Sequence, residues 1–239
     1  MKYNTLFVNL FNGPGVSKIT TAASTFSNLK KAGYNAEIIT EYAKQKTWLL
    51  DRKTLLCQPY VTAKQLYKQY IVNEEVEVAV TDSPILLGLV YPGFGISPAW
   101  KEGVVHQFNE FRNLNFLITR NSKLHPYNPK GRSQTEEEAI AKDAEIAAML
   151  NHFKVPYIAL SSVSHDDNEQ VIFKVIQSLL SVEERPIDFT IVDKTSDTLV
   201  NTYTDHESAR IRLTDLLQDS DNEGRYEIVL NALKGLKEI

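Results

Sequence analysis

Cysteine is almost absent from this chain of 239 residues, which contains only Cys57. A single cysteine cannot form a disulfide within the chain, and no Cys/His set has the spacing of zinc ligands. Neither a covalent bridge nor a structural metal therefore replaces a hydrophobic core. We expect a cytoplasmic protein, because a chain that makes no use of disulfides suits a reducing compartment.

The sequence also lacks long hydrophobic runs and a strong excess of one charge. Its first apolar stretch, residues 5–11, is too short to span a membrane, and no signal-peptide pattern precedes it, so we expect this stretch to belong to the fold. The 26 Lys and Arg against 30 Asp and Glu give a net charge of −4. This balance argues against a protein that coats nucleic acid by charge alone, although a local basic groove remains compatible with it. We expect a small-molecule partner.

Hydrophobic residues make up 43% of the chain, enough to build a substantial core and to exclude disorder as the main state. At roughly 150 residues per domain, the length accommodates one domain and a small appendage. Five apolar runs without polar alternation predict strands. They are Thr5–Leu10, Ala36–Thr40, Val76–Thr81, Asn115–Thr119 and Pro156–Leu160. Such runs, separated by helices, are typical of a parallel sheet covered on both faces, so the predicted class is α/β.

Segments of helical periodicity lie between and after these runs. They are Lys18–Ala32, Glu41–Leu50, Val61–Asn73, Pro98–Asn113, Thr135–Phe153 and Asn168–Ser181. Gly33 is a typical stop signal after the first helix. Either Ser133 with Glu136 or Thr135 with Glu138 offers a capping box at the fifth.

The pattern changes after residues 183–186. Two short strands, a helix over about residues 205–218 and a last strand at Tyr226–Leu230 are predicted, which makes a ββαβ appendage. The two predicted strands are Asp188–Val192 and Thr198–Tyr203. We therefore expect a main domain over residues 1–184 and an appendage over 185–239, too small to hold a large core of its own.

A glycine-rich turn between the first strand and the first helix is the most informative segment. Residues 12–20 read Asn-Gly-Pro-Gly-Val-Ser-Lys-Ile-Thr, and the order strand, glycines, lysine, helix is that of a phosphate-binding loop. In such a loop, backbone N–H groups surround phosphates, the lysine neutralises their charge, and a hydroxyl next to it holds magnesium. Gly13, Gly15 and Lys18 fit this pattern. A glycine-rich turn without any ligand is the alternative.

Three positions depart from the phosphate-loop pattern. Asn12 stands at the first glycine, Ser17 at the glycine before the lysine, and Ile19 at the hydroxyl position. Thr20 comes one residue late, and one residue on a helix rotates a side chain by about 100°. Magnesium binding through Thr20 therefore requires a relaxed loop.

Two further features suit phosphate chemistry. Asp82 directly follows a predicted strand, where a carboxylate can hold the water shell of a magnesium ion, although an aspartate there also commonly caps a turn. The segment Arg120–Arg132 follows the fourth strand and carries five basic residues. It suits a lid that closes over a transferring phosphoryl group. A solvated surface loop is the alternative.

Together the glycine-rich turn, Thr40-Glu41-Tyr42-Ala43-Lys44, Thr81-Asp82-Ser83-Pro84 and the segment 120–132 resemble the P-loop nucleotide and nucleoside kinases. The likeness is to the AAA-type ATPase/kinase branch, which includes nicotinamide riboside kinase domains and many bacteriophage kinases, and it covers about residues 4–181. It implies ATP and Mg²⁺ as cofactors.

The resemblance also implies roles for individual residues. Lys18 would contact the β- and γ-phosphates, and Asp82 would serve the metal or activate the acceptor hydroxyl. Glu41 and Tyr42 would contact the acceptor. Arg120, Lys130 and Arg132 would act as lid cations. Purely structural roles are the alternatives. Lys18 and Asp82 would form a structural pair, Arg120 would cap its strand, and Glu41 would stabilise the first turn of a helix.

Three functions are compatible with these residues. The first is ATP-dependent phosphoryl transfer to a nucleoside, a nucleotide or a related hydroxyl acceptor. The second is a bacteriophage kinase that acts on hydroxymethylated bases in DNA, which the acidic residues of the appendage make less attractive. The third is a catalytically silent P-loop fold that serves as an interaction module, motivated by the three departures in the glycine-rich turn.

Overall fold

The computed structural model describes residues 2–16, 18–120, 135–161, 165–183, 189–193, 198–203 and 226–230. The chain divides into two compact units, Met1–Phe173 and Lys174–Ile239. Helix α7, His165–Glu183, runs across this division. The domain boundary expected after residue 184 stays a prediction.

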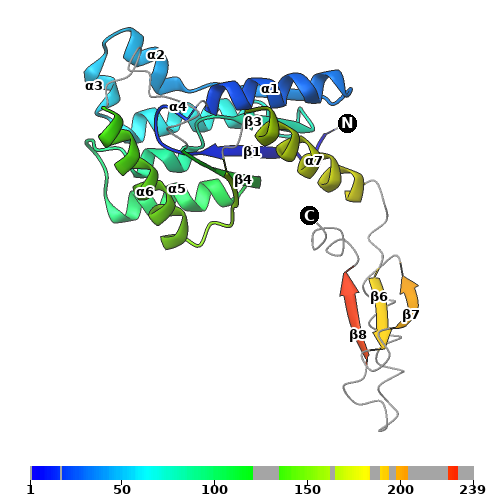
Figure 1. The fold of residues 1–239 in the computed structure, drawn as a ribbon. Coiled ribbons are helices and arrows are strands. Elements are labelled where there is room, and N and C mark those ends of the chain that lie inside the picture. Colours follow the sequence, from blue (N-terminus) through cyan, green and yellow to red (C-terminus); the bar gives the residue numbers. More distant parts are fainter. Residues whose placement is uncertain are drawn as a thin grey trace. The chain divides into compact units, whose positions relative to one another are not determined.

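A five-stranded parallel sheet forms the centre of the first unit (Figure 1). Its strands are β1 Leu6–Phe11, β2 Ala36–Ile39, β3 Val78–Thr81, β4 Arg112–Thr119 and β5 Ile158–Ser161, in the spatial order β2-β3-β1-β4-β5. Every residue of the central strand β1 is buried, which explains why its sequence is a continuous apolar run. The predicted α/β class with a parallel sheet is confirmed.

Helices cover both faces of this sheet. Their bounds are α1 Lys18–Lys31, α2 Tyr42–Trp48, α3 Arg52–Leu55, α4 Gln58–Tyr70, α5 Pro98–Asn109 and α6 Glu136–His152, with a short 3₁₀ helix η1 at Ile85–Leu89. Helix α1 lies on one side of the sheet together with the first part of α7, whose Glu169 accepts a hydrogen bond from Asn28 (3.3 Å), and α5 and α6 lie on the other (Figure 1). Helix α6 begins with the predicted Thr135/Glu138 capping box. No helix in the described part of the chain combines the length and apolar composition that a membrane crossing requires.

The predicted end of the fourth helix at Asn113 is wrong. Helix α5 ends at Asn109, and Arg112 and Asn113 already belong to β4, where they pair with Leu6 and Phe7. The amide of the buried Asn9 donates to Asn113 Oδ1 (2.8 Å) and Asn115 Oδ1 (3.0 Å) across the two strands. Because these polar side chains bond to one another, β4 extends beyond its apolar run.

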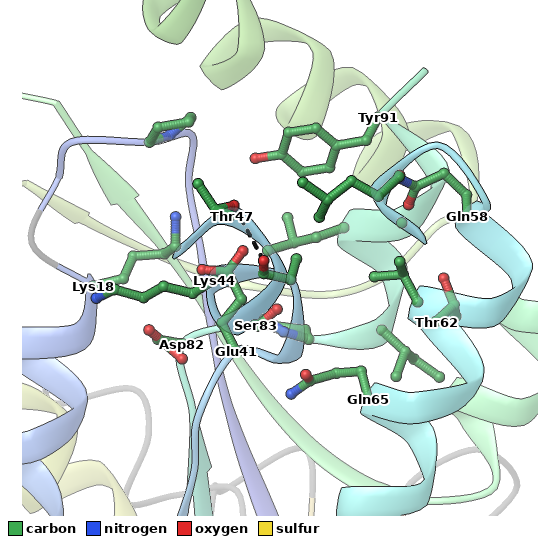
Figure 2. A pocket seen from close by; sticks show the side chains of 18 of the residues that line it. Lys18, Glu41, Lys44, Thr47, Gln58, Thr62, Gln65, Asp82, Ser83 and Tyr91 are labelled. Atoms are coloured by element: carbon green, nitrogen blue, oxygen red, sulfur yellow. Dashed lines mark hydrogen bonds between the residues drawn. The ribbon is translucent and has the colours of Figure 1, made fainter. Parts of the chain in front are cut away.

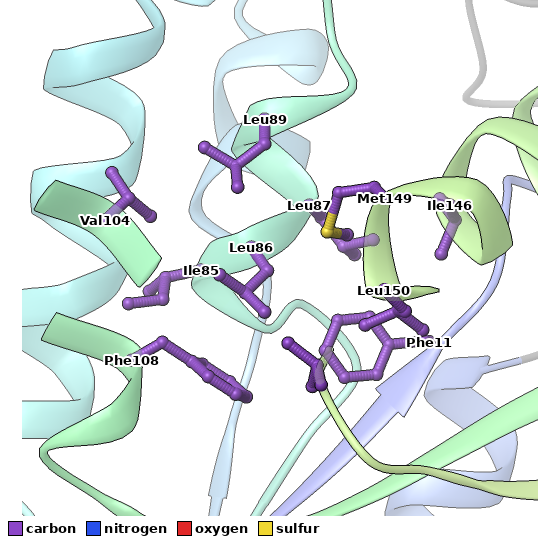
Figure 3. Close-up of a cluster of buried hydrophobic side chains, with 11 residues drawn as sticks. Phe11, Ile85, Leu86, Leu87, Leu89, Val104, Phe108, Ile146, Met149 and Leu150 are labelled. Carbon is purple, nitrogen blue, oxygen red and sulfur yellow. The ribbon is translucent and has the colours of Figure 1, made fainter. Parts of the chain in front are cut away.

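A hydrophobic cluster fills the space between the sheet and helices α5 and α6 (Figure 3). Phe11 and Phe108 meet edge to face with ring centroids 6.3 Å apart, and Leu86 and Leu150 are fully buried beside them. Such an arrangement stabilises the fold mainly through removal of apolar area from water. The cluster anchors η1 beneath the carboxyl edge of the sheet, and η1 directly follows Asp82 and its turn.

The second unit contains an antiparallel sheet of three strands. They are β6 Phe189–Asp193, β7 Thr198–Tyr203 and β8 Tyr226–Leu230, in the order β7-β6-β8. The three strands predicted for the appendage are confirmed to within one residue at their ends. The predicted helix over residues 205–218 lies outside the described residues.

Candidate active site

The carboxyl ends of β1, β2 and β3 open on one cavity of about 340 Å³ (Figure 2). It lies where the strand order of a parallel sheet reverses around β1, the usual place for ligands in such folds. Four segments contribute side chains: the glycine-rich turn, the start of α2, the α3–α4 region, and the chain that follows β3. The lining includes Gly15, Lys18, Ile19, Glu41, Lys44, Leu55, Gln58, Val61, Thr62, Gln65, Asp82, Ser83, Ile85, Leu87 and Tyr91.

The glycine-rich turn holds the amine of Lys18 against its own backbone. Lys18 Nζ donates to the carbonyl oxygens of Asn12 (2.5 Å) and Gly13 (2.9 Å). Gly15 has a φ of +93°, which a residue with a side chain adopts only at a cost, so the glycine sets the curvature of the turn. The lysine thus lies where the resemblance to phosphate loops requires it, and the turn's own carbonyls are its partners.

Asp143 of α6 closes the turn from the other side. Its Oδ1 accepts the N–H of Gly13 (2.9 Å), and a Cβ at Gly13 would lie only 2.3 Å from that oxygen, so only glycine fits there. Arg120 donates from Nε to Asp143 Oδ2 (2.6 Å) and from its terminal nitrogen to the carbonyl of Pro14 (2.6 Å). Arg120, expected to be a lid cation, is therefore packed against the turn. Asp143 is one of several acids on α6, and no sequence signal distinguished it from the others.

Two carboxylates from neighbouring strand ends enter the cavity. Glu41 is the N-cap residue of α2, and Asp82 directly follows β3. Burial raises the pKa of each above its ordinary value, and the amine of Lys18 opposes both shifts. Burial likewise lowers the pKa of Lys18, against the attraction of Glu41, Asp82 and Asp143. Lys18 and these two acids thus share one site, and Lys44 lines it as well.

The remaining predicted site residues lie elsewhere. Tyr42 does not line the cavity, and its ring meets Tyr60 edge to face at 6.1 Å. Thr20 is exposed on α1, while its neighbour Ile19 lines the cavity. Ser17, Lys130 and Arg132 lie outside the described residues.

Several lining residues escaped the sequence analysis because helix periodicity does not single out polar residues that face inward. Gln58, Thr62 and Gln65 lie on the buried face of α4. Gln65 Oε1 accepts the N–H of Tyr42 (2.9 Å) and so helps to hold the turn that carries Glu41. Thr62 Oγ1 is buried and has no hydrogen-bond partner among the described residues, so it is available to a ligand.

Tyr91 forms part of the opposite wall. Lys142 of α6 donates to the neighbouring carbonyl of Val90 (2.7 Å) and lies over the Tyr91 ring, 5.3 Å from its centroid. Burial raises the pKa of the Tyr91 hydroxyl further above neutral pH. It offers the cavity an aromatic face and a hydrogen-bond donor.

The donor set fits a magnesium ion that arrives with phosphates. Asp82 Oδ1 is buried in the cavity wall and has no hydrogen-bond partner among the described residues. No group of three or more His, Cys, Asp or Glu in the described ranges could hold a metal by itself. Magnesium commonly takes only one or two protein carboxylates and completes its shell with water and phosphate oxygens. Ile19 cannot supply the hydroxyl that this position usually provides.

Comparison with known proteins identifies the fold. No protein-family model and no curated protein sequence matches the chain. The structure of NadR in complex with NAD and AMP-PNP matches with a TM-score of 0.53 and 14% identity over 72% of this chain and 50% of that one. Thymidylate kinase from Ehrlichia chaffeensis matches with a TM-score of 0.50 and 12% identity over 72% of this chain and 99% of that one. The present chain thus spans half the length of the NadR chain. Its first unit has the α/β fold of P-loop kinases.

Proposed function

We propose that this chain is a P-loop phosphotransferase that moves the γ-phosphoryl group of ATP to a nucleoside, a nucleotide or a related hydroxyl acceptor. One observation carries the proposal: the glycine-rich turn, its half-buried Lys18 and the carboxylates of Glu41 and Asp82 surround a single cavity at the carboxyl edge of the sheet. The kinase-like fold supports the same reading by analogy. The proposed setting is the cytoplasm, which would be the host's if a bacteriophage encodes the chain.

Donor binding would fall to the turn. A triphosphate that approaches Gly13–Lys18 offers Lys18 Nζ charged oxygens in place of the two carbonyls that it now contacts. Its negative charge would also raise the lowered pKa of this amine, so binding would favour the ammonium form. Mg²⁺, when bound with the phosphates, would neutralise their charge, and Asp82 is the residue placed to hold it or one of its waters.

Acceptor binding would fall to the wall formed by α4 and the chain after β3. An apolar slot of Val61, Ile85 and Leu87 suits a ring, and the unpartnered Thr62 hydroxyl lies beside it. The acceptor oxygen would attack the γ-phosphorus while the bond from that phosphorus to the bridging oxygen breaks, and ADP would leave. The acceptor's proton would pass to Glu41 or Asp82, whose raised pKa values suit a carboxylate that accepts a proton.

A catalytically silent P-loop fold is the second candidate. It is favoured by the hydrogen bonds that the turn already makes. Lys18 Nζ donates to two carbonyl oxygens of the turn, and Asp143 accepts the N–H of Gly13, which a bound phosphate would use. Ile19, which stands where a metal-binding hydroxyl is usual, also favours the silent fold. The two candidates differ in whether any phosphoryl transfer occurs.

The test is transfer of radiolabelled γ-phosphate from ATP with Mg²⁺ to a panel of nucleosides, nucleotides and DNA that contains hydroxymethylated bases. We expect transfer to at least one acceptor. Lys18→Ala and Asp82→Ala should each lower its rate by about a hundredfold or more, because each removes charge stabilisation from the transition state. Lys30→Ala, in the exposed last turn of α1, is the matched control and should keep the parental rate. A folded parent protein that labels no acceptor would favour the silent fold.

A further inference from the structure

Helix α4 is oriented with its polar face inward. The buried residues Gln58, Thr62, Gln65 and Gln69 recur at the spacing of one helix face. Residues displaced by half a turn from them, Tyr60, Lys64, Tyr67 and Ile71, are exposed. A helix that only supports a sheet buries its apolar face instead. The fold therefore does not explain the outward aromatic side chains of α4.

These aromatic side chains belong to a continuous row of tyrosines and lysines. Lys46 of α2 lies 5.7 Å from the ring centroid of Tyr42, whose ring meets that of Tyr60 at 6.1 Å, and Lys64 lies 5.5 Å from the Tyr60 centroid. Tyr67 lies three residues after Lys64, about one turn farther along α4. Tyr60 and Tyr67 are 44% and 60% exposed, so both present ring surface to solvent. We call Lys46, Tyr42, Tyr60, Lys64 and Tyr67 the Tyr–Lys row.

Exposed apolar side chains also stand at the rim of the cavity described above. Leu56 and Phe94 are 57% and 79% exposed. Leu56 lines the cavity, and its carbonyl accepts the N–H of Phe94 (2.6 Å). Aromatic surface is thus present at the cavity mouth as well as along α4. Single exposed apolar residues are ordinary, but several in one region mark a binding surface.

The same segment is basic in an acidic protein. Residues 42–71 contain six Lys or Arg and one Asp, a local net charge of +5, whereas the whole chain has −4. The six are Lys44, Lys46, Arg52, Lys53, Lys64 and Lys68. Lys44 lines the cavity itself. The partner of this surface should therefore be an anion with flat apolar faces.

We infer that the Tyr–Lys row and the rim around Leu56 and Phe94 bind a single-stranded polynucleotide. Bases stack on exposed aromatic rings regardless of sequence, and lysines beside the rings match the phosphates that link the bases. A second copy of this chain is a poor occupant, because a symmetric interface would bring two patches of charge +5 together. A lipid surface suits helices whose lysines and apolar residues lie on opposite faces, whereas here they share one face.

A strand bound to this surface would also supply the acceptor of the proposed reaction. The row lies on the side of α4 opposite to the cavity-lining Gln58 and Thr62, so only the part of a strand that crosses the rim at Leu56 would present a nucleotide to the cavity. This second step rests on the proposed function, since it makes a nucleotide within a strand the phosphoryl acceptor. Binding of the strand does not depend on it.

The test is fluorescence anisotropy of a labelled single-stranded DNA of about 20 nucleotides, long enough to cover one binding site, with the full chain and without ATP. We expect binding that weakens as salt rises, because phosphate contacts release counterions. Tyr60→Ala with Tyr67→Ala should weaken it about tenfold or more, and Tyr60→Phe with Tyr67→Phe should retain it, since a phenyl ring still stacks. Thermal melting should show that each variant stays folded, because both rings are partly exposed and the alanine variant loses only the ring contacts of Tyr60 with Tyr42 and Lys64.

A charge-matched pair separates local recognition from net charge. Lys64→Glu should weaken binding about fivefold, whereas Lys30→Glu, at the exposed end of α1, should change it about twofold or less. A parent that binds no single strand, or equal losses in the two charge variants, would overturn the inference. So would a parent that self-associates, or binds anionic lipid vesicles, through Tyr60 and Tyr67 but binds no DNA. Because no ATP is present, failure here leaves the proposed phosphoryl transfer untouched, and failure of transfer leaves strand binding untouched.

Discussion

The buried charges of the cavity show how single residues set its chemistry. Lys18, Glu41 and Asp82 each lose hydration, and burial is the largest cause of the pKa shift of all three. The attraction between Lys18 and the two acids opposes these shifts without cancelling them. An ionised site of this kind costs stability while it is empty, and it is best compensated by a charged ligand.

Asp82→Asn should make the protein more stable at neutral pH while it impairs phosphoryl transfer. Because the folded-state pKa of Asp82 is raised, its ionised form disfavours folding, and this loss of stability grows as the pH rises above the ordinary value of 3.8. The melting temperature of the variant should therefore exceed that of the parent at about pH 8, and the difference should shrink toward about pH 4. Thermal melts at both pH values measure it. The contrary result is a difference in melting temperature, variant minus parent, that is lower at pH 8 than at pH 4. It would mean that attraction to Lys18 outweighs burial.

Sequence analysis identified residues that mark the edge of the sheet and missed those that complete the cavity. Lys18 was a candidate from the glycine-rich turn, Asp82 from its place after a strand, and Glu41 from the family resemblance, and the three meet because parallel strands end at one edge. Asp143 reaches the turn from α6, so its contact with Gly13 depends on how two distant segments pack. Helical periodicity does not report such a contact.

At the scale of elements, the glycine-rich turn and α4 are the two unusual pieces. The turn carries Ile19 where a metal-binding hydroxyl is usual, and α4 buries glutamines where apolar residues are usual. The strands of the main sheet were predictable because continuous apolar runs have few alternatives in a parallel sheet. The inward polar face of α4 was not predictable, because it serves the cavity and violates the pattern that identifies a helix's buried side.

Restoring the turn should strengthen magnesium-dependent nucleotide binding. Ser17→Gly with Ile19→Ser restores backbone freedom before Lys18 and a hydroxyl on the residue that lines the cavity. We expect ATP affinity to rise about tenfold with Mg²⁺ and to change little without it, since one charge-assisted contact contributes about 1.5–3 kcal/mol. Titration of both proteins with and without Mg²⁺ measures the change, and Ile19→Val is the control that adds no ligand. An equal gain without Mg²⁺ would show that the loop backbone, and not the hydroxyl, limits affinity.

At the scale of the whole molecule, the described residues of the cavity belong to the first compact unit. The second unit contributes a sheet of its own strands, β6, β7 and β8. Nothing in the proposed phosphoryl transfer uses that sheet. The two units are therefore expected to be separable in function.

A chain that ends after α7 should keep the donor site. Residues 1–183 contain the five-stranded sheet, the cavity and all of α7, so we expect cooperative unfolding and a nucleotide affinity within about twofold of the full chain. Thermal melting and nucleotide titration of the shortened chain provide the measurement. A shortened chain that melts cooperatively but binds no nucleotide would assign part of the donor site to the second unit.

Calorimetric titration of the full chain with ATP, with and without Mg²⁺, tests the central claim most directly, because every step of the proposed transfer needs a bound donor. We expect saturable binding at a single site, strengthened by Mg²⁺, and a loss of about tenfold or more in Lys18→Ala, which removes a charge-assisted hydrogen bond to phosphate. Lys30→Ala should bind as the parent does. Absence of ATP binding to the folded parent, or equal affinity in Lys18→Ala, would contradict the account.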